Sequence, residues 1–490
     1  MSADLSFLSL HPFIRDTAHR KLLGTIIGSA LGDTIGLYTE FLPASVAEES
    51  YPSRRFSLLP KPTPFHADGH RDRFAAAAWT DDTDHALLLL LAYLHNGGDL
   101  DALPTDFASR LAIWSNQGLR CLDRPPLGIG KTIGQVIRDP NFPSGPEAVA
   151  LKQWLRSGRR AAANGSLMRT HPLGLMAVPL SRDAAFESAA RLSRTTHPDP
   201  RCVVACCAAV ALVRGIVRGE VRGEADVDML LEAAFQYVIA RKDLRDPDAA
   251  DSKTTERDGH SHDDNDDVVT NNGNTQSLDH AEFSRHVHAQ EFADLQLDDS
   301  MSMGFVYKCL GASILALRRA IRLTRAGVTF AQTSSITNRG PQMPGERIGA
   351  VAFEEIITEL TMFGGDADTN CCVAGALVGA WVGFDGLPEH WFGGLAHREW
   401  LVAKSEMLSR LVGIMERPKG GEQPDPDTAP DGGKPLLSRE ELEKRDLEFV
   451  EMMLKKGEER RKKEEARQKE SAFGLGKWIK AAVIGKRDQG

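Results

Sequence analysis

The chain has 490 residues, enough to bury a sizeable core in one large domain or in two or three average ones. Its 42% hydrophobic and 26% charged residues are the balance of an ordinary globular protein. The net charge of −9 disfavours binding of DNA or RNA, because nucleic-acid-binding surfaces are basic, but it leaves a nucleotide-like ligand open.

The N-terminal segment, MSADLSFLSLHPFIRD, has no basic stretch followed by a sustained apolar run, so we expect no secretory signal and an intracellular protein, cytoplasmic or nuclear. The odd number of seven cysteines fits this expectation. Adjacent pairs at 206–207 and 371–372 lack C-x-x-C spacing, which predicts buried, reduced thiols. Apolar runs such as HALLLLLAYL are too short to cross a bilayer, so we expect no transmembrane segment.

Apolar residues recur at helical spacing in several long segments, whereas period-two strand patterns are scarce. The sequence therefore predicts an all-α fold, a single multi-helix globule. The predicted core helices cover residues 20–32, 84–97, 201–217, 303–321 and 370–383.

Two of these helices carry glycine at every fourth position. Four-residue spacing places the glycines on one face, where a neighbouring backbone can approach closely. Such a face is also typical of membrane helix dimers, but Lys21 and Asp33 in the first segment favour a soluble core. The glycines are Gly24, Gly28, Gly32 and Gly36 in the first helix, and Gly375, Gly379 and Gly383 in the last.

Acidic residues stand at three of the predicted helix ends. Asp33 lies among glycines and apolar residues, and either a cap on a neighbouring helix or another buried polar role fits it. Glu40 follows a helix break, and the residues alone allow an exposed loop position or an acid at a site. The other two clusters each precede an apolar helix: Thr80, Asp81, Asp82 and Thr83 in WTDDTDHALLLL, and Asp366, Asp368 and Thr369 in GGDADTNCCVAG.

One such cluster alone is typical of a helix N-cap, but a cap needs a single oxygen, and each cluster supplies two carboxylates and a hydroxyl. If the two helix starts meet, four like charges repel unless cations lie among them. Oxygen ligands of this kind select Mg²⁺, Mn²⁺ or Ca²⁺ over zinc or copper, and paired carboxylates commonly build two-ion sites.

Two segments interrupt the helical pattern. Residues 242–296 are acidic and polar with few large apolar side chains, which predicts a disordered insertion. Its histidines fit metal capture or, as we favour, a solvated loop. Residues 416–437 are rich in Pro, Gly and Asp and predict a flexible linker, and the charge-dense residues 438–490 predict a largely solvated helical tail that can bind a partner. The globular domain is then 15–415. The histidines are His260, His262, His280, His286 and His288.

Six motifs in order resemble the ADP-ribosylglycohydrolase family, the group of dinitrogenase reductase-activating glycohydrolases and ADP-ribosyl-acceptor hydrolases. The resemblance covers about residues 20 to 400 without the insertion. It implies an all-α globule with a centre of two Mg²⁺ or Mn²⁺ ions that cleaves ADP-ribose from an acceptor, either a protein side chain or a small molecule. The motifs are GTIIGSALGDTIGLYTEF, WTDDTDHALLLL, PLGIGKTIGQV, NGSLMRTHPLGL, SRTTHPDP and GGDADTNCCVAGALVGAWVG.

Carried over residue by residue, the resemblance implies three sets of site residues. The expected metal ligands are Thr80, Asp81, Asp82, Asp366, Asp368 and Thr369. The expected catalytic residues are Glu40, Asp81 and Asp82. The residues expected to contact the ADP-ribose are Asn164, Gly165, Ser166, Met168 and His197.

The sequence departs from the family pattern at two places. Ala367 stands where the family has threonine, and Asp84-His85 stand where it has Glu-Met. None of the inferred ligands is lost, so the departures concern turnover and substrate preference more than metal binding. The alternative is a catalytically weak or inactive ADP-ribose-binding or scaffold protein, and a generic Mg²⁺ phosphohydrolase is a third hypothesis.

Overall fold

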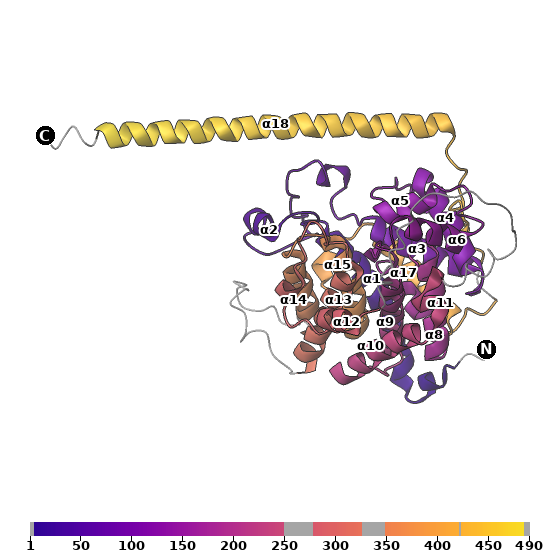
Figure 1. Ribbon diagram of the computed structural model, residues 1–490. Helices are drawn as coiled ribbons and strands as arrows, with labels where there is room; N and C mark the ends of the chain where they lie inside the picture. Colours follow the sequence, from indigo (N-terminus) through magenta and orange to yellow (C-terminus); the bar gives the residue numbers. More distant parts are fainter. Residues whose placement is uncertain (1–3, 249–277, 326–347, 421–422, 485–490) are drawn as a thin grey trace, which may run out of the picture. The chain divides into compact units, whose positions relative to one another are not determined.

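The computed structural model describes residues 4–248, 278–325, 348–420 and 423–484. Over these ranges the chain is helical, and β pairing is confined to isolated bridges at Leu119–Arg124 and Ala163–Phe305 (Figure 1). The predicted all-α fold is thereby confirmed. The α-helices are α1 (Pro12–Gly36), α2 (Ala44–Ser50), α3 (Asp81–His95), α4 (Leu103–Gln117), α5 (Lys131–Ile137), α6 (Pro146–Arg156), α7 (His171–Met176), α8 (Arg182–Arg194), α9 (Pro200–Val217), α10 (Glu224–Ile239), α11 (Lys242–Arg245), α12 (His280–Val287), α13 (Val306–Arg325), α14 (Ile348–Thr361), α15 (Ala367–Val382), α16 (Glu389–Phe392), α17 (Arg398–Leu411) and α18 (Arg439–Ile484).

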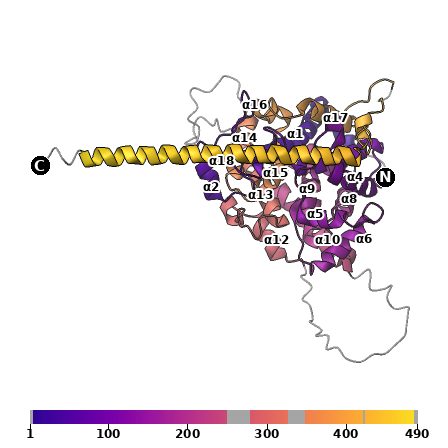
Figure 2. The same ribbon diagram turned by 90° about the horizontal axis from the view of Figure 1, so that it is seen from above.

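The chain divides into two compact units. The first, Met1–Pro64 with Ala76–Pro435, contains the core helices. The second combines Phe65–Ala75 with Leu436–Gly490. In this second unit α18 is one continuous helix of 46 residues (Figure 2), and Arg460 forms an ion pair of 2.6 Å with Asp72 of the short segment.

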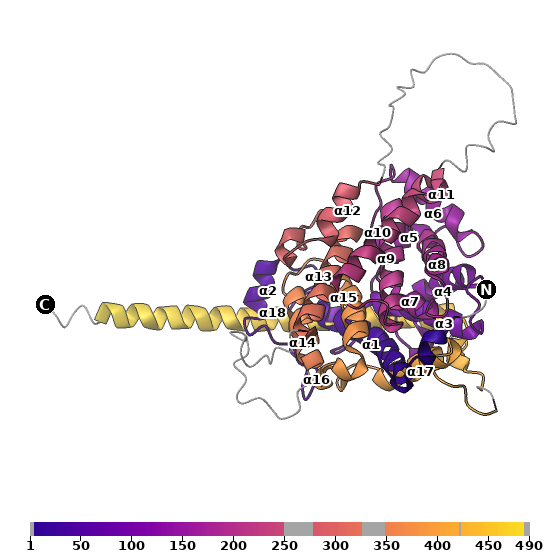
Figure 3. The ribbon, with the colours of Figure 1, turned by 90° about the horizontal axis from the view of Figure 1, so that it is seen from below.

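Helices α1 and α15 pack against each other along their glycine faces (Figure 3). A Cβ added at any of the four α1 glycines would overlap a backbone carbonyl of α15, so the two backbones are in direct contact. Gly383 lies past the end of α15 with a φ of +74°, the left-handed conformation that favours glycine. The facing pairs are Gly24 with Gly379, Gly28 with Gly375, Gly32 with Cys371 and Gly36 with Ala367.

Around this pair, α9 and α13 complete the interior of the first unit. The expectation that every apolar run is too short for a bilayer is wrong for α9, because its 18 residues are long and apolar enough to cross a membrane. In the structure, however, 94% of that helix is buried against protein. We therefore interpret α9 as the core helix of the globule. All seven cysteines are buried free thiols, which confirms the prediction made for the pairs 206–207 and 371–372.

The predicted disordered insertion is too wide. Residues 242–248 and 278–296 are described, and they include α11, α12 and the short 3-10 helix at Phe292–Leu295. Phe283 and Val287 are four residues apart and buried on one face of α12, a pattern that the surrounding acidic residues obscure. The remaining part of the insertion, 249–277, lies outside the described residues, as do His260 and His262.

The predicted linker, 416–437, includes a docked segment that begins at Asp425. Within the first unit, Arg110 donates to the carbonyl of Thr428 at 2.8 Å, and Lys404 lies 2.9 Å from the Asp427 carboxylate. Lys404 is 5% exposed and also pairs with Asp425. This segment, although rich in proline, glycine and aspartate, is docked on the domain because its aspartates form ion pairs with the buried Lys404. Composition alone does not reveal that contact.

We predict that Gly32→Ala lowers the free energy of unfolding by about 3 kcal/mol, the upper part of the usual cost of overpacking, because the neighbour that must move is backbone. Chemical denaturation measures the change. Gly457→Ala in α18 is the control, since an added Cβ there has no atom within 4 Å. Equal stability of the two variants would contradict the close contact between α1 and α15.

Candidate metal centre

The two acidic clusters meet at the N-terminal ends of α3 and α15. Thr80 is the N-cap of α3, where its hydroxyl oxygen accepts from the Asp82 N–H at 3.3 Å. The same hydroxyl donates to Asp368 Oδ2 at 3.2 Å, which joins the first cluster to the second. Asp366 occupies the N-cap position of α15 but makes no side-chain cap. Its carboxylate is therefore available to the site.

Asp33 caps α3 from the neighbouring helix α1. Its Oδ1 accepts from the Thr80 N–H at 2.9 Å, and its Oδ2 accepts from the Thr83 N–H at 3.0 Å and the Thr83 hydroxyl at 2.6 Å. The side chain is fully buried. Of the two roles open to Asp33 from sequence, the structure supports the cap, which holds the start of α3 beside α1.

Glu40 reaches the cluster from the turn that follows α1. It is 6% exposed, and one of its carboxylate oxygens lies within 4.8 Å of oxygens of Asp366 and Asp368. The turn is fixed by the backbone, because the Phe41 N–H donates to the carbonyl of Gly365 at 2.6 Å. Glu40 is thus a buried acid at the site, not an exposed loop residue.

No lysine or arginine in the described ranges forms an ion pair with Asp81, Asp82, Asp366 or Asp368. Asp84, on the same helix α3, has a full set of partners. Asp84 accepts from the Trp79 indole at 2.7 Å, the Trp114 indole at 3.1 Å and the Arg124 guanidinium at 3.1 Å. By contrast, Asp82 Oδ2 and Asp368 Oδ1 are buried without a hydrogen-bond partner among the described residues. Buried polar atoms of native proteins are rarely left this way.

Burial raises the pKa of Asp81, Asp82 and Asp368 well above the usual value, and neighbouring carboxylates, such as Glu40 beside Asp81 and Asp368, raise it further. Burial also raises the pKa of Asp366 to about 6, against hydrogen bonds that lower it. The protein alone therefore does not stabilise the charged forms. A divalent cation does, because it supplies the missing positive charge.

The donor set fits such a cation. It consists of carboxylate and hydroxyl oxygens, and the described residues of the cluster contain no imidazole or thiolate ligand group, which is the chemistry of Mg²⁺ or Mn²⁺. Thr369 belongs to the cluster through Asp82, whose pKa a hydrogen bond from Thr369 lowers against the larger effect of burial. Of the predicted metal ligands, these contacts bring together Thr80, Asp82, Asp366, Asp368 and Thr369. Asp81 lies near enough to Glu40 for that charge to raise its pKa.

Asn164 and Gly165 form another side of the site beside the start of α15, which we call the Asn164 wall. The Asn164 side-chain amide donates to Asp366 Oδ2 at 2.7 Å. A Cβ added at Gly165 would lie 3.2 Å from His197 Nε2, a buried ring nitrogen without a hydrogen-bond partner in the described chain. The other ring nitrogen of His197 lies 2.7 Å from the Thr196 hydroxyl. Burial lowers the pKa of His197 to about 3, so the ring is neutral.

Ser166 and Met168 face the core more than the site. The Ser166 hydroxyl accepts from Ser193 at 3.2 Å and from the Cys206 thiol at 3.4 Å, and it is 1% exposed. Met168 is 4% exposed, and its carbonyl accepts from the Cys372 thiol at 3.6 Å. Their predicted contact with a ligand stays a prediction.

The two departures from the family pattern have different surroundings. Ala367 is fully buried, and its carbonyl faces Gly36 in the contact between α1 and α15. The His85 ring is fully buried at 4.5 Å from the Trp114 ring, and neither of its nitrogens has a partner within the described part of the chain. Burial lowers the pKa of His85 well below its usual range, so it adds no charge.

Three neighbours of the site are not among the predicted site residues. Gly128 has a φ of +87°, and an added Cβ would overlap Asp81 Oδ1. The Gly304 carbonyl accepts from the Asn164 N–H at 3.0 Å. Arg169 donates to the Gly165 carbonyl at 2.6 Å. Gly128 and Arg169 stand inside two of the quoted motifs, so a signal was present, whereas nothing marked Gly304.

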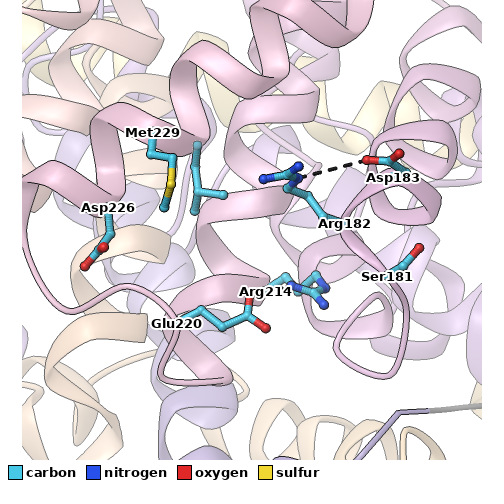
Figure 4. Close-up of a pocket in the computed structure, with 8 residues that line it drawn as sticks. Ser181, Arg182, Asp183, Arg214, Glu220, Asp226 and Met229 are labelled. Carbon is cyan, nitrogen blue, oxygen red and sulfur yellow. Dashed lines mark hydrogen bonds and ion pairs between the residues drawn. The ribbon is translucent and has the colours of Figure 1, made fainter.

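A cavity of about 340 Å³ lies elsewhere, between the start of α8, the end of α9 and α10 (Figure 4). Its polar groups already have partners. Arg214 pairs with Glu220 at 2.6 Å, and Asp226 accepts from the Gly223 N–H at 3.0 Å as a cap of α10. We therefore place the functional site at the carboxylates and not in this cavity.

The stability of the metal-free protein should fall as pH rises, and the stabilisation by bound metal should grow over the same range. The pKa of Asp366 is raised to about 6, above an unfolded value of about 4, so in metal-free protein its stabilising contribution is full below about pH 4 and is lost as pH rises through about 6. Cations need the ionised carboxylates, so the increase of Tm with Mg²⁺ or Mn²⁺ should grow from about pH 5 to about pH 7.5. Thermal unfolding of chelator-treated protein measures it. A metal-induced increase of Tm that becomes smaller as pH rises would contradict a metal site at these carboxylates.

Asp368→Asn should raise Tm of the metal-free protein near neutral pH, because it removes a buried charge that has no cationic partner, and should abolish the increase with metal. Asp84→Asn is the matched control on α3. It should lower the free energy of unfolding by about 3 kcal/mol, since Arg124 loses its partner, and should retain the metal-induced shift. If Asp368→Asn kept the metal-induced shift and Asp84→Asn lost it, the roles assigned to the two aspartates would be wrong.

Known proteins resemble this chain over much of its length. Residues 15–420 match the family model described as ADP-ribosylglycohydrolase. An ADP-ribosylarginine hydrolase, Tri1, of Pseudomonas putida strain GB-1 is 28% identical over 38% of this chain and 44% of its own. The uncharacterized protein YegU of Escherichia coli K12 is 29% identical over 36% of this chain and 48% of its own. The chain thus spans about half the length of the curated relatives it matches.

A solved ADP-ribosylglycohydrolase-related protein complex aligns with a TM-score of 0.47 and 22% identity, covering 81% of this chain and 99% of that one. The family match covers the core helices, both acidic clusters and the Asn164 wall. The chain belongs to the ADP-ribosylglycohydrolase family.

Proposed function

We propose that this protein hydrolyses the glycosidic bond between ADP-ribose and an acceptor, with two Mg²⁺ or Mn²⁺ ions held by the carboxylate clusters of α3 and α15. One observation carries the proposal: Asp82 Oδ2 and Asp368 Oδ1 are buried and lack hydrogen-bond partners among the described residues. Membership of a glycohydrolase family supports the reaction class.

Six residues would hold the ions. When bound, such ions polarise hydroxyl groups of a sugar and lower the pKa of a water molecule. The carboxylates themselves offset positive charge that develops on the ribose as the bond to the acceptor breaks. The ligands are Thr80, Asp81, Asp82, Asp366, Asp368 and Thr369.

Glu40 is the residue best placed to move a proton. It lies within 4.8 Å of the second cluster, and it belongs to a turn and not to the helices that carry the other acids. We assign it the uptake of the proton released when water attacks the anomeric carbon. Asp81 and Asp82 support this step by fixing the water and the ribose.

Asn164, Gly165 and His197 are proposed to position the ADP-ribose. Because His197 is neutral, its unpartnered Nε2 can exchange a hydrogen bond with a hydroxyl or a phosphate oxygen of the ligand. Gly165 leaves room beside that nitrogen, which a larger residue would fill. Ser166 and Met168 shape this wall from behind.

Arginine is the first acceptor to test. The relatives from P. putida and from Serratia proteamaculans strain 568, the latter 27% identical over 38% of this chain, are named ADP-ribosylarginine hydrolases. A panel should include ADP-ribosylated arginine, ADP-ribosylated serine and O-acetyl-ADP-ribose, each with Mg²⁺, Mn²⁺ or chelator.

The decisive variants are Asp81→Asn and Asp368→Asn. Each should lower the hydrolysis rate by at least about 100-fold, because one charged group at the reacting centre is lost. Asp16→Asn, on the exposed face of α1, is the control and should keep the wild-type rate. Full activity of chelator-treated wild type, or of the variants, would contradict the metal mechanism.

The rival function is an ADP-ribose-binding protein with little or no catalysis. Ala367 favours it, because this position carries no hydroxyl and is buried directly between the two aspartates of α15. Calorimetry separates the two functions. Tight binding of ADP-ribose without release of product from any substrate of the panel would support the rival.

A further inference from the structure

One face of α18 contacts the segment Phe65–Ala75 within the second unit. The Lys456 ammonium donates to the Asp72 carbonyl at 2.6 Å, and the Arg460 guanidinium pairs with the Asp72 carboxylate at 2.6 Å. Residues four apart project from the same side of an α-helix, so both contacts belong to one face, which we call the Asp72 face. Three apolar residues of the same face are partly buried: Leu442, Phe449 and Met453.

A second face of α18 carries three apolar side chains that are exposed. Leu447, Val450 and Leu454 are three and four residues apart, the spacing that aligns side chains on one side of an α-helix. At 3.6 residues per turn they lie about 120° around the helix from the Asp72 face. Their exposed fractions are 60%, 52% and 66%. We call these three side chains the apolar stripe.

The apolar stripe has the pattern of a surface that pairs helices. Single exposed apolar residues are ordinary on proteins, but three at alternating spacings of three and four occupy the a and d positions of a heptad repeat. In proteins a helix gains most of its stability from the packing of such a face. The Asp72 face packs in this way, whereas the described parts of the chain leave the apolar stripe largely in contact with water. A partner that covers the stripe would therefore stabilise α18.

Charge is distributed unevenly on the two sides of the apolar stripe. Residues 439–451 include six acidic and three basic side chains, whereas residues 452–462 include five basic and two acidic ones. The helix is thus acidic before the middle of the stripe and basic after it. Two such helices repel each other in parallel alignment, because like halves meet. In antiparallel alignment each acidic half lies beside a basic half.

This arrangement is complementary to itself. A dimer with two-fold symmetry needs one surface that matches its own rotated copy. An apolar centre flanked by opposite charges meets that condition, because the rotation places apolar side chains on apolar side chains and acidic residues beside basic ones. An anionic membrane, or a partner with charge of one sign, would match only one half of the helix.

We propose that the apolar stripe pairs α18 with α18 of a second copy of this chain, in antiparallel orientation. The match to the glycohydrolase family ends at residue 420, so this surface lies outside the matched region and the inference does not depend on the proposed function. Three apolar side chains per copy make a small interface, so the dimer should dissociate on dilution.

The first test is sedimentation equilibrium of the full chain over a range of concentrations, which measures the dissociation constant of the dimer. Leu447→Gln and Leu454→Gln should each raise that constant at least about tenfold, because each removes buried apolar area from both copies. Leucine and glutamine have similar helix propensities, so α18 should persist in both variants, and circular dichroism checks this. Met452→Gln is the matched control, since Met452 is 36% exposed on another side of α18, and it should change the constant less than about threefold.

The second test determines the orientation by charge reversal. Antiparallel pairing about the centre of the stripe places Asp446 opposite Lys455 of the second copy. In the same register Glu440 lies opposite Arg461 of the second copy. Lys455→Glu combined with Arg461→Glu should therefore raise the dissociation constant about tenfold. Adding Glu440→Lys and Asp446→Lys to that variant should return the constant to the wild-type value, because both facing pairs are again opposite in sign.

A full chain that stays monomeric at every concentration would overturn the proposal. So would a dimer that Leu447→Gln and Leu454→Gln leave unchanged, since another surface would then hold it. In a parallel pair, Lys455→Glu with Arg461→Glu would reduce the repulsion between the basic halves and would not weaken the dimer. That result, or a loss that the added reversals do not restore, would overturn the antiparallel orientation.

Discussion

The contact between the glycine faces of α1 and α15 is the constraint on which the rest of the site depends. Helices with side chains at the interface lie 8–10 Å apart, whereas here backbone touches backbone at four successive turns. That proximity holds Glu40, on the turn after α1, beside the start of α15. Asp33, at the end of α1, holds the start of α3 against the same helix. A wider helix pair would separate the start of α3 and Glu40 from the start of α15.

The same contact brings carboxylates of different segments close together. On α3, Asp84 accepts hydrogen bonds from two indoles and one guanidinium, so this buried acid is fully compensated by the protein. The protein leaves Asp82 and Asp368 without such partners in the described residues. Groups required for function often lower the stability of the fold when nothing is bound, and a ligand that binds them raises that stability.

Much of this could be predicted from the sequence, because the signals are local. Helical periodicity, glycine spacing and paired acids at helix starts predict the core helices and the acidic clusters that meet in the fold. Contacts between distant segments could not be predicted. Nothing in the pattern assigns Arg124 to Asp84, Gly304 to Asn164 or Lys404 to the docked segment at Asp425. Composition misjudged α12 for the same reason, because its two buried residues gain partners only in the folded chain.

The most direct test of the account is diffraction from crystals grown with Mn²⁺, recorded where manganese scatters anomalously. We expect anomalous density for two ions between the α3 and α15 clusters, with the orphan oxygens of Asp82 and Asp368 among the ligands. A folded protein with an intact cluster, but with no manganese there at saturating Mn²⁺, would contradict it. So would a lysine or arginine side chain placed among the same carboxylates.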